Sequence, residues 1–260
     1  MKIATYNVNS INARLPRVLE WFDEAKPDVT VLQEIKCVDE KFPAIEFEDR
    51  GYNVAVHGQK TYNGVAFISK FPIEETLKGL PGAPDDEQAR YIEAVVIPDK
   101  NGPVRIGGLY LPNGNPAPGP KYDYKLAWMK RLIKRAINLL SQEEAFVLAG
   151  DFNVIPQNED CYDPIAWSDD ALFRTETKAL FRKLLNLGLT DALRRIDPTS
   201  VRYTFWDYQR GAWPKDNGIR IDHLLLSPEA ADRLTNAGVD RGVRGREKAS
   251  DHVPVWIELQ

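Results

Sequence analysis

Short apolar runs alternate with amphipathic stretches along the first part of the chain. The apolar alternation over 2–8 predicts a strand, and a helix is predicted to follow it. In that helix Leu15, Val18, Leu19 and Phe22 have the spacing of one buried face, and Pro16 lies near the first turn. Further strands are predicted at 28–32, 52–56, 65–69, 91–97 and 104–111, with Pro and Gly residues between them.

The second half of the chain carries longer amphipathic stretches. A helix is predicted over 122–140 and another over 177–187, the second closed by Gly188. Strands are predicted at 146–149, 202–206, 220–226 and 253–259, with a short helix between the last two. No linker or internal repeat is visible, so we expect a single domain over 1–260. Consecutive strands with interspersed helices predict an α/β fold in which two sheets pack face to face, with helices outside.

Composition narrows the possibilities only slightly. The net charge is −4, from 34 basic and 38 acidic residues, which neither supports nor excludes a nucleic-acid partner. Cys37 and Cys161 form no disulfide framework or zinc motif, so we expect free thiols in a reducing compartment. We see no signal peptide and no apolar run of the ~20 residues that span a bilayer. We therefore expect a cytoplasmic monomer with no membrane contact and no obligate protein partner.

Polar side chains recur at the ends of the predicted strands. They comprise carboxylates, carboxamides, a phenol and an imidazole, with no thiol and no serine paired with a base. Such a set is typical of a metal site that polarises phosphate and activates water, because buried acidic groups are costly unless they coordinate, pair or react. The residues are Asn7, Glu34, Tyr110, Asp151, Asn153, Asp222, Asp251 and His252.

Three of these residues suit a hard metal ion. Glu34 and Asn7 offer oxygen ligands of the type that Mg²⁺ and Mn²⁺ accept, and Asp251 adds a second acidic group. The alternatives are an exposed glutamate opening a loop and an asparagine in a turn.

The remaining residues suit proton transfer and phosphate binding. Asp151 and Asn153 alternate with Phe152, so both should point the same way, the first accepting a proton from water and the second donating to phosphate. Asp222 would fix the tautomer of His252 and favour its charged form. Tyr110 would donate its hydroxyl to phosphate. The alternatives are a structural turn at 150–153 and an ordinary half-buried strand tyrosine.

Aromatic and basic residues alternate in the segment 203–220. Phe205, Trp206, Tyr208 and Trp213 are interleaved with Arg210, Lys215 and Arg220, a combination that suits nucleic acid through stacking and phosphate contact. The chain has no G-x-x-x-x-G-K-[ST] loop, no G-x-S-x-G elbow and no C-x-x-C pair. Nucleotide-driven, serine-hydrolase and zinc chemistries therefore lack support.

Taken in order, the motifs resemble the exonuclease III family of apurinic/apyrimidinic endonucleases. The matching segments are NVNSINAR, LQEIK, HGQKTYNGVA, LYLPNG, GDFN, FWDYQ, GIRIDHLLLS and SDHVPVW. The resemblance implies a four-layer αββα sandwich of the DNase I type. It also implies hydrolysis of duplex DNA with Mg²⁺ or Mn²⁺, as one or two ions, both 3′→5′ from an end and 5′ to abasic sites.

The same resemblance implies roles for individual residues. Glu34, Asn7 and Asp251 would serve the metal, Asp151 would activate or orient water, and Asp222 would orient His252. Asn153 and Tyr110 would contact phosphate, and Phe205 and Trp206 would shape a pocket for a flipped-out sugar without its base. Predicted contacts to DNA also include Asn113, Arg210, Ile219 and Arg220.

Two positions depart from the family pattern. Asn9 stands where some members have a metal-binding aspartate, and Ile219 stands where others have a bulky aromatic residue. Two other functions stay open: a phosphoesterase of the same fold that acts on inositol phosphates or sphingomyelin, and a DNA-binding module without catalysis. The segment 205–220 favours DNA over a small ester, and the competent residue at every catalytic position favours an enzyme.

Overall fold

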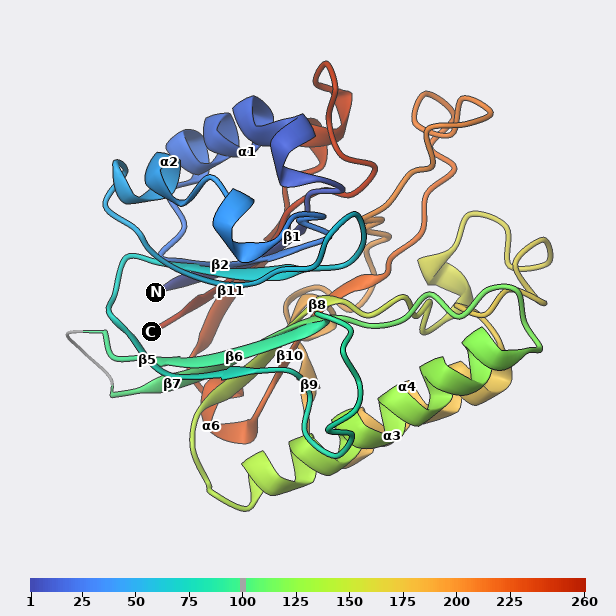
Figure 1. Cartoon of the computed structure of the whole chain (residues 1–260). Coiled ribbons are helices and arrows are strands. Elements are labelled where there is room, and N and C mark those ends of the chain that lie inside the picture. The colour runs from blue at the N-terminus through green and yellow to red at the C-terminus, as the bar shows by residue number, and fades with distance from the viewer. Residues whose placement is uncertain (99–101) are drawn as a thin grey trace.

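Two six-stranded β-sheets pack face to face and carry helices on their outer faces (Figure 1). The computed structural model describes residues 1–98 and 102–260. The helices α1 (Ile11–Ala25) and α2 (Ala44–Glu48) lie outside one sheet, and α3 (Pro120–Leu140) and α4 (Thr175–Asn186) lie outside the other. The predicted four-layer αββα sandwich is confirmed.

Each sheet has one parallel pair of strands at its centre. The order of the first sheet is β11-β12-β1-β2-β4-β3, in which only β1 and β2 run parallel, and α1 connects them. A parallel pair needs such a crossover, because a tight turn can join only antiparallel strands. The strands are β1 (Lys2–Asn7), β2 (Val29–Gln33), β3 (Asn53–His57), β4 (Val65–Ser69), β11 (Leu234–Val239) and β12 (Val255–Leu259).

The second sheet repeats this plan. Its order is β5-β6-β7-β8-β10-β9, and α3 connects its central parallel pair, β7 and β8. The strands are β5 (Ile73–Lys78), β6 (Tyr91–Val96), β7 (Val104–Tyr110), β8 (Phe146–Asp151), β9 (Thr190–Asp191) and β10 (Asp222–Leu226). The shorter helices are α5 (Ala192–Ile196), α6 (Pro228–Ala231), η1 (Asp39–Lys41), η2 (Asn158–Asp160) and η3 (Arg241–Gly245).

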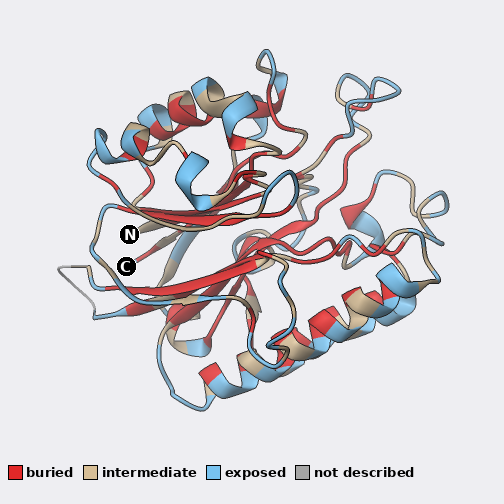
Figure 2. Ribbon diagram, viewed as in Figure 1, coloured by how far each residue is buried: buried red, intermediate tan, exposed pale blue. Residues whose placement is uncertain are grey.

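The main core lies between the sheets, where the central strands of both sheets are buried (Figure 2). Val31 and Phe67 from the first sheet pack there with Ile106 and Ala149 from the second. Burying a side chain of this kind stabilises the fold by about 1.5–3 kcal/mol. Gly108 of β7 permits the close approach, because a Cβ atom there would come within 2.6 Å of the Val31 side chain. This packing fixes the position of one sheet relative to the other. The ends of their central strands therefore also have fixed relative positions.

The predicted elements differ from the structure in a few places. The predicted strand at 202–206 is wrong, because Phe205 forms only isolated bridges to Ile219 and His252. The strands β5 and β11 are not predicted, since their exposed polar residues obscure the alternation. Helix α1 begins at Ile11, which places Pro16 inside it instead of in its first turn.

Two further findings concern membrane-spanning helices and the state of the cysteines. Within residues 1–98 and 102–260, no helix has the length and apolar character needed to cross a membrane. Cys37 and Cys161 are both buried and form no disulfide.

Candidate active site

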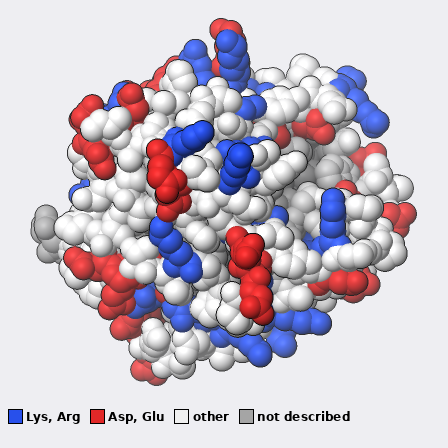
Figure 3. Space-filling model, viewed as in Figure 1, with Lys and Arg blue, Asp and Glu red and all other residues white. Residues whose placement is uncertain are grey.

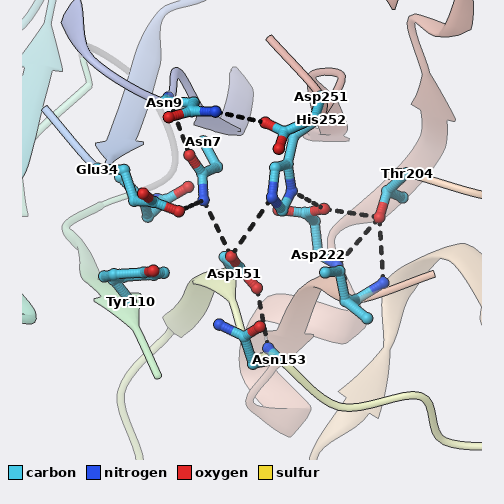
Figure 4. Close-up of polar contacts among 12 residues, drawn as sticks. Asn7, Asn9, Glu34, Tyr110, Asp151, Asn153, Thr204, Asp222, Asp251 and His252 are labelled. Atoms are coloured by element: carbon cyan, nitrogen blue, oxygen red, sulfur yellow. Dashed lines mark hydrogen bonds and ion pairs between the residues drawn. The ribbon is translucent and has the colours of Figure 1, made fainter. Parts of the chain in front are cut away.

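The polar residues predicted at strand ends meet at one edge of the sandwich (Figure 4). The carboxyl ends of the central parallel strands in both sheets lie at this edge. Tyr110 ends β7 directly opposite Asp151, which ends β8, and Asp151 is in turn in register with Asp222 at the start of β10. Asn7 ends β1, Glu34 follows β2, and His252 precedes β12. The fold thus collects these side chains from six segments.

Asn7 connects the two sheets at this edge. Its side-chain nitrogen donates to Glu34 Oε1 at 2.9 Å and to Asp151 Oδ2 at 3.0 Å, and its carboxamide oxygen accepts from the backbone N–H of Asn9. The nitrogen, not the oxygen, therefore faces the two carboxylates. In this arrangement Asn7 positions Glu34 and Asp151, and its role as an oxygen ligand for metal stays a prediction.

Asp151 is completely enclosed, with donors on both oxygens. Oδ2 accepts from Asn7, and Oδ1 accepts from the backbone N–H of Asn153 at 2.9 Å. Burial raises the pKa of Asp151 to about 7, and the neighbouring carboxylate of Asp222 adds to this, although the His252 side chain opposes it. The His252 side chain therefore offsets only part of the effect of burial on Asp151, as expected where a further cation or a proton belongs.

His252 and Asp222 form the predicted pair. Nδ1 of His252 lies 2.9 Å from Asp222 Oδ2, while Nε2 lies 3.7 Å from Asp151 Oδ2. Burial disfavours the imidazolium, but Asp222 and Asp151 outweigh it and raise the pKa of His252 to about 10. His252 is therefore a cation that donates from Nδ1 to Asp222 and presents Nε2–H to the centre of the site.

Thr204 supports this pair and is not predicted from the sequence. Its hydroxyl donates to Asp222 Oδ2 at 2.6 Å and accepts from the backbone N–H groups of Ile221 and Asp222, each at 3.1 Å. Thr204 is fully buried. A threonine between Tyr203 and Phe205 carries no signal of this role, because only the folded register brings it to Asp222.

Asn153 is held by the loop that follows β7. Its side-chain nitrogen donates to the carbonyl of Leu111 at 2.9 Å, and Asn113 donates to its Oδ1 at 3.3 Å. The buried Lys125 of α3 donates to the carbonyls of Pro112, Asn113 and Asn153. Lys125 is also not predicted from the sequence. The carboxamide of Asn153 therefore has hydrogen-bond partners at both its nitrogen and its oxygen, and the partner of the oxygen is Asn113.

Tyr110 faces Glu34 and Asp151 across the site. Burial raises the pKa of Tyr110 well above the usual value, and the charge of Glu34 adds to this. The guanidinium of Arg90 lies over its ring, 4.8 Å from the centroid. The phenol is therefore protonated and available as a donor.

The flank beyond Glu34 carries a basic residue. Lys36 Nζ lies 2.9 Å from Glu34 Oε2 and donates to Asn9 Oδ1 at 2.6 Å, and Asn9 Nδ2 donates to Asp251 Oδ1 at 3.1 Å. Although burial opposes ionisation, Lys36 and Asn7 hold the pKa of Glu34 below its usual value. Glu34 is therefore ionised.

The donor set fits a divalent cation. Among the described residues, Glu34, Asp151 and His252 each offer one ligand atom, and these atoms lie within 4.8 Å of one another. Because His252 is the cation of a pair with Asp222, the two carboxylates are the better ligands, and carboxylate oxygen is what Mg²⁺ and Mn²⁺ accept. Asp251 lies outside this group of three.

A cavity of about 600 Å³ opens beside His252. Phe205 forms its inner wall and packs edge-on against the His252 ring, with centroids 5.0 Å apart. Ile219, Trp167 and Arg210 also line it. Figure 3 shows the surface hollowed on the side from which these loops project.

The model of the Endonuclease/Exonuclease/phosphatase family matches residues 4–252. The chain belongs to this family. It is 31% identical to exodeoxyribonuclease III of Haemophilus influenzae, over the full length of both chains. It also matches the full-length relative in Bacillus subtilis, an exodeoxyribonuclease, at 28% identity with 99% of this chain and 98% of that protein covered.

Solved structures agree with this assignment. An AP endonuclease from Archaeoglobus fulgidus is 36% identical, with a TM-score of 0.94 over 100% of this chain and 99% of that one. The 3′-5′ exonuclease NExo from Neisseria meningitidis is 40% identical, with a TM-score of 0.95 over 100% of both chains. The predicted membership of the exonuclease III family is confirmed, and with it the prediction of a DNA-repair nuclease.

Two residues that were predicted to contact DNA are buried inside the protein. Arg220 is 2% exposed and is enclosed by carboxylates, with Nε 2.7 Å from Asp160 Oδ1 and Nη1 2.8 Å from Asp191 Oδ2. Although burial opposes ionisation, Arg220 and His223 hold the pKa of Asp191 below its usual value. Arg220 therefore binds protein, and its assignment to DNA is corrected.

Trp206 is the second correction. It is 1% exposed, donates to Asp216 Oδ1 at 2.9 Å and packs edge-on against Trp213. It does not line the cavity of about 600 Å³ that Phe205 lines. Alternation along 203–206 explains the difference, because Phe205 points to the cavity and its neighbours point away.

The Arg220 cluster leads to a test of stability. Replacing Arg220 by Met (Arg220→Met) leaves the buried carboxylates of Asp160 and Asp191 without their main partner, so we expect a loss of about 3–5 kcal/mol in the free energy of unfolding, measured by urea titration. The exposed Arg210→Met is the control and should change it by less than about 0.5 kcal/mol. Wild-type stability of Arg220→Met together with weakened DNA binding would restore the original assignment.

Proposed function

We propose that this nuclease is a Mg²⁺- or Mn²⁺-dependent DNA-repair phosphodiesterase that removes nucleotides 3′→5′ from duplex DNA and cleaves 5′ to abasic sites. The observation that carries the proposal is the convergence of Asp151, Glu34 and the His252–Asp222 pair beside a cavity of about 600 Å³. The full-length relatives named for exonuclease and AP endonuclease activity support it.

The carboxylates of Glu34 and Asp151 would hold the divalent ion. When bound, such an ion supplies a Lewis acid that polarises the scissile phosphate and a template that orients it. Glu34 is suited to this, because Asn7 and Lys36 fix both of its oxygens. A ligand fixed in this way would hold the ion in one position.

Asp151 and His252 would act on the nucleophile and on the developing charge. Asp151, with both oxygens fixed, accepts the proton of the attacking water. The Nε2–H of His252 points to the same space, 3.7 Å from Asp151, and stabilises the negative charge that grows on the phosphoryl oxygens. Tyr110 adds a second donor from the opposite wall.

Duplex DNA would lie across both sides of the site. The cavity lined by Phe205, Ile219 and Arg210 would receive the sugar of a displaced nucleotide. On the other side a second cavity, of about 490 Å³, is lined by Asn113, Arg90 and Lys121, which suit phosphate contacts. Charges of both signs are interspersed on the face in Figure 3, so binding depends on such local cations more than on net charge.

The proposal extends to the setting of the enzyme. We infer that it works in the cytoplasm as a monomer, with DNA as its partner and no obligate protein partner. The full-length bacterial relative supports the cellular setting.

Replacing Asp151 by Asn tests the proposed base. We expect Asp151→Asn to lower turnover on a 5′-labelled duplex with one abasic analogue by about 10²–10⁴-fold in Mg²⁺, while DNA binding persists. Asp123→Asn, an exposed change at the start of α3, is the matched control and should retain full activity.

The products discriminate between the activities. A Mg²⁺-dependent cut just 5′ to the lesion, abolished by chelator, supports the AP-endonuclease activity. Shortening from the 3′ end alone restricts the proposal to exonuclease activity and makes Ile219 the first residue to examine. Intact DNA in every lane would contradict the proposal and favour small phosphate esters.

Thr204 provides a test of the His252–Asp222 pair. Thr204→Val removes the hydroxyl that orients Asp222. We expect kcat to fall about 10–100-fold, the usual effect of losing a side chain that orients a functional residue, and KM to stay nearly unchanged. Thr204→Ser keeps the hydroxyl and should retain most of the activity. Equal kcat values for the two variants would show that Thr204 does not orient the pair.

A further inference from the structure

The side chain of Lys125, in the helix α3, is completely buried. Its Nζ donates to the backbone carbonyls of Pro112 and Asn113, each at 3.1 Å, and to that of Asn153 at 2.6 Å. An ammonium has three donors, so every donor of Lys125 has a partner. Because a buried charge is costly even when it is hydrogen-bonded, this arrangement indicates a role that an apolar residue could not fill.

The three carbonyls belong to the loops that follow the central strands of the second sheet. Pro112 and Asn113 follow β7, Asn153 follows β8, and α3 is the crossover helix between these two parallel strands. The active site lies where the two strands end. The helix that connects the strands therefore also connects the two loops at the site, through one side chain.

Each of these loops carries one carboxamide of the site. Asn113 Nδ2 donates to Asn153 Oδ1 at 3.3 Å, a long hydrogen bond that a small shift of either loop would break. Asn153 has a φ of +47°, in the left-handed region, and its carbonyl makes the shortest of the three bonds to Lys125. Lys125 therefore holds the backbone of Asn153 in the conformation that directs its carboxamide into the site.

The stem and the charge of Lys125 are fixed as well. Gly114, with a φ of +91°, packs so closely that a Cβ atom there would come within 2.6 Å of Lys125 Cδ. Burial lowers the pKa of Lys125 to about 7, an effect that Asp151 and Asp170 oppose and Arg90 increases. The three carbonyls require the charged form, because a neutral amine has only two N–H donors.

We propose that Lys125 is a positioning residue, which holds Asn153 where its carboxamide, beside that of Asn113, contacts the scissile phosphate. The inference rests on the proposed function, because it takes this phosphate to be that of DNA. It goes beyond that function, since it gives a part in turnover to a side chain that is completely buried and therefore cannot touch the DNA.

A double-mutant cycle tests this role in the cleavage of a 5′-labelled duplex with one abasic analogue. Lys125→Met keeps an unbranched stem and removes the three donors, so we expect kcat to fall about 10–100-fold, with KM nearly unchanged. Asn153→Gly removes the carboxamide at a φ that glycine accepts. In that background Lys125→Met should have little further effect, because Lys125 acts through Asn153. Lys134→Met, at an exposed position of the same helix, should leave kcat unchanged.

A second variant covers the case in which Lys125→Met does not fold. Lys125→Gln keeps two N–H donors on a neutral side chain, so kcat should fall less, and again only where Asn153 is present. A readout without DNA is the side-chain NH₂ signals of Asn113 and Asn153 in nuclear magnetic resonance spectra. These signals should shift in the Lys125 variants and stay in place in Lys134→Met.

The outcomes separate this role from a purely structural one. Wild-type kcat in a folded Lys125 variant, whatever its stability, would overturn the proposal. Equal losses of kcat with and without the Asn153 carboxamide, or unshifted NH₂ signals, would overturn it too. Shifted signals in the variants, together with a wild-type enzyme that leaves DNA intact, would overturn the proposed function and support the positioning of Asn153 by Lys125.

Discussion

The hydrogen bonds from the side chain of Asn7 to Glu34 and Asp151 are the interaction on which the site depends. Asn7 and Glu34 belong to one sheet and Asp151 to the other, so these bonds tie the sheets together where their central strands end. Two neighbouring carboxylates at such an edge repel each other, and removing the buried one, Asp151, from water costs several kcal/mol. The shared N–H donors of Asn7 offset part of this cost and leave a space that a cation can enter.

The remaining features follow from compensation of the same buried charge. His252 is protonated because Asp222 and Asp151 flank it, and Asp222 is oriented because His252 and Thr204 donate to it. Each group is stabilised by its neighbours, so the cluster is a network whose members are interdependent. A site held in this way is preorganised, since its donors already point to the space where charge develops during phosphodiester hydrolysis.

Sequence analysis could locate this site because acidic and amide residues follow apolar strands, which is a local and physical signal. Asp151, Asp222 and His252 were all found in this way, and the αββα layers followed from the alternation of strands and helices. Thr204 and Lys125 could not be found, since their roles arise only when distant segments meet. Arg220 was misassigned for the related reason that its partners Asp160 and Asp191 are 60 and 29 positions away. The orientation of the Asn7 carboxamide likewise depends on neighbours that only the fold supplies.

A crystal structure of Asp151→Asn with Mn²⁺ and a duplex containing one abasic analogue would test the central claim most directly. The account predicts an anomalous Mn²⁺ peak beside Glu34 and the scissile phosphate between this ion and His252 Nε2. It also predicts the displaced sugar in the cavity formed by Phe205 and Ile219. A phosphate bound away from His252, with Mn²⁺ absent from Glu34, would contradict the account.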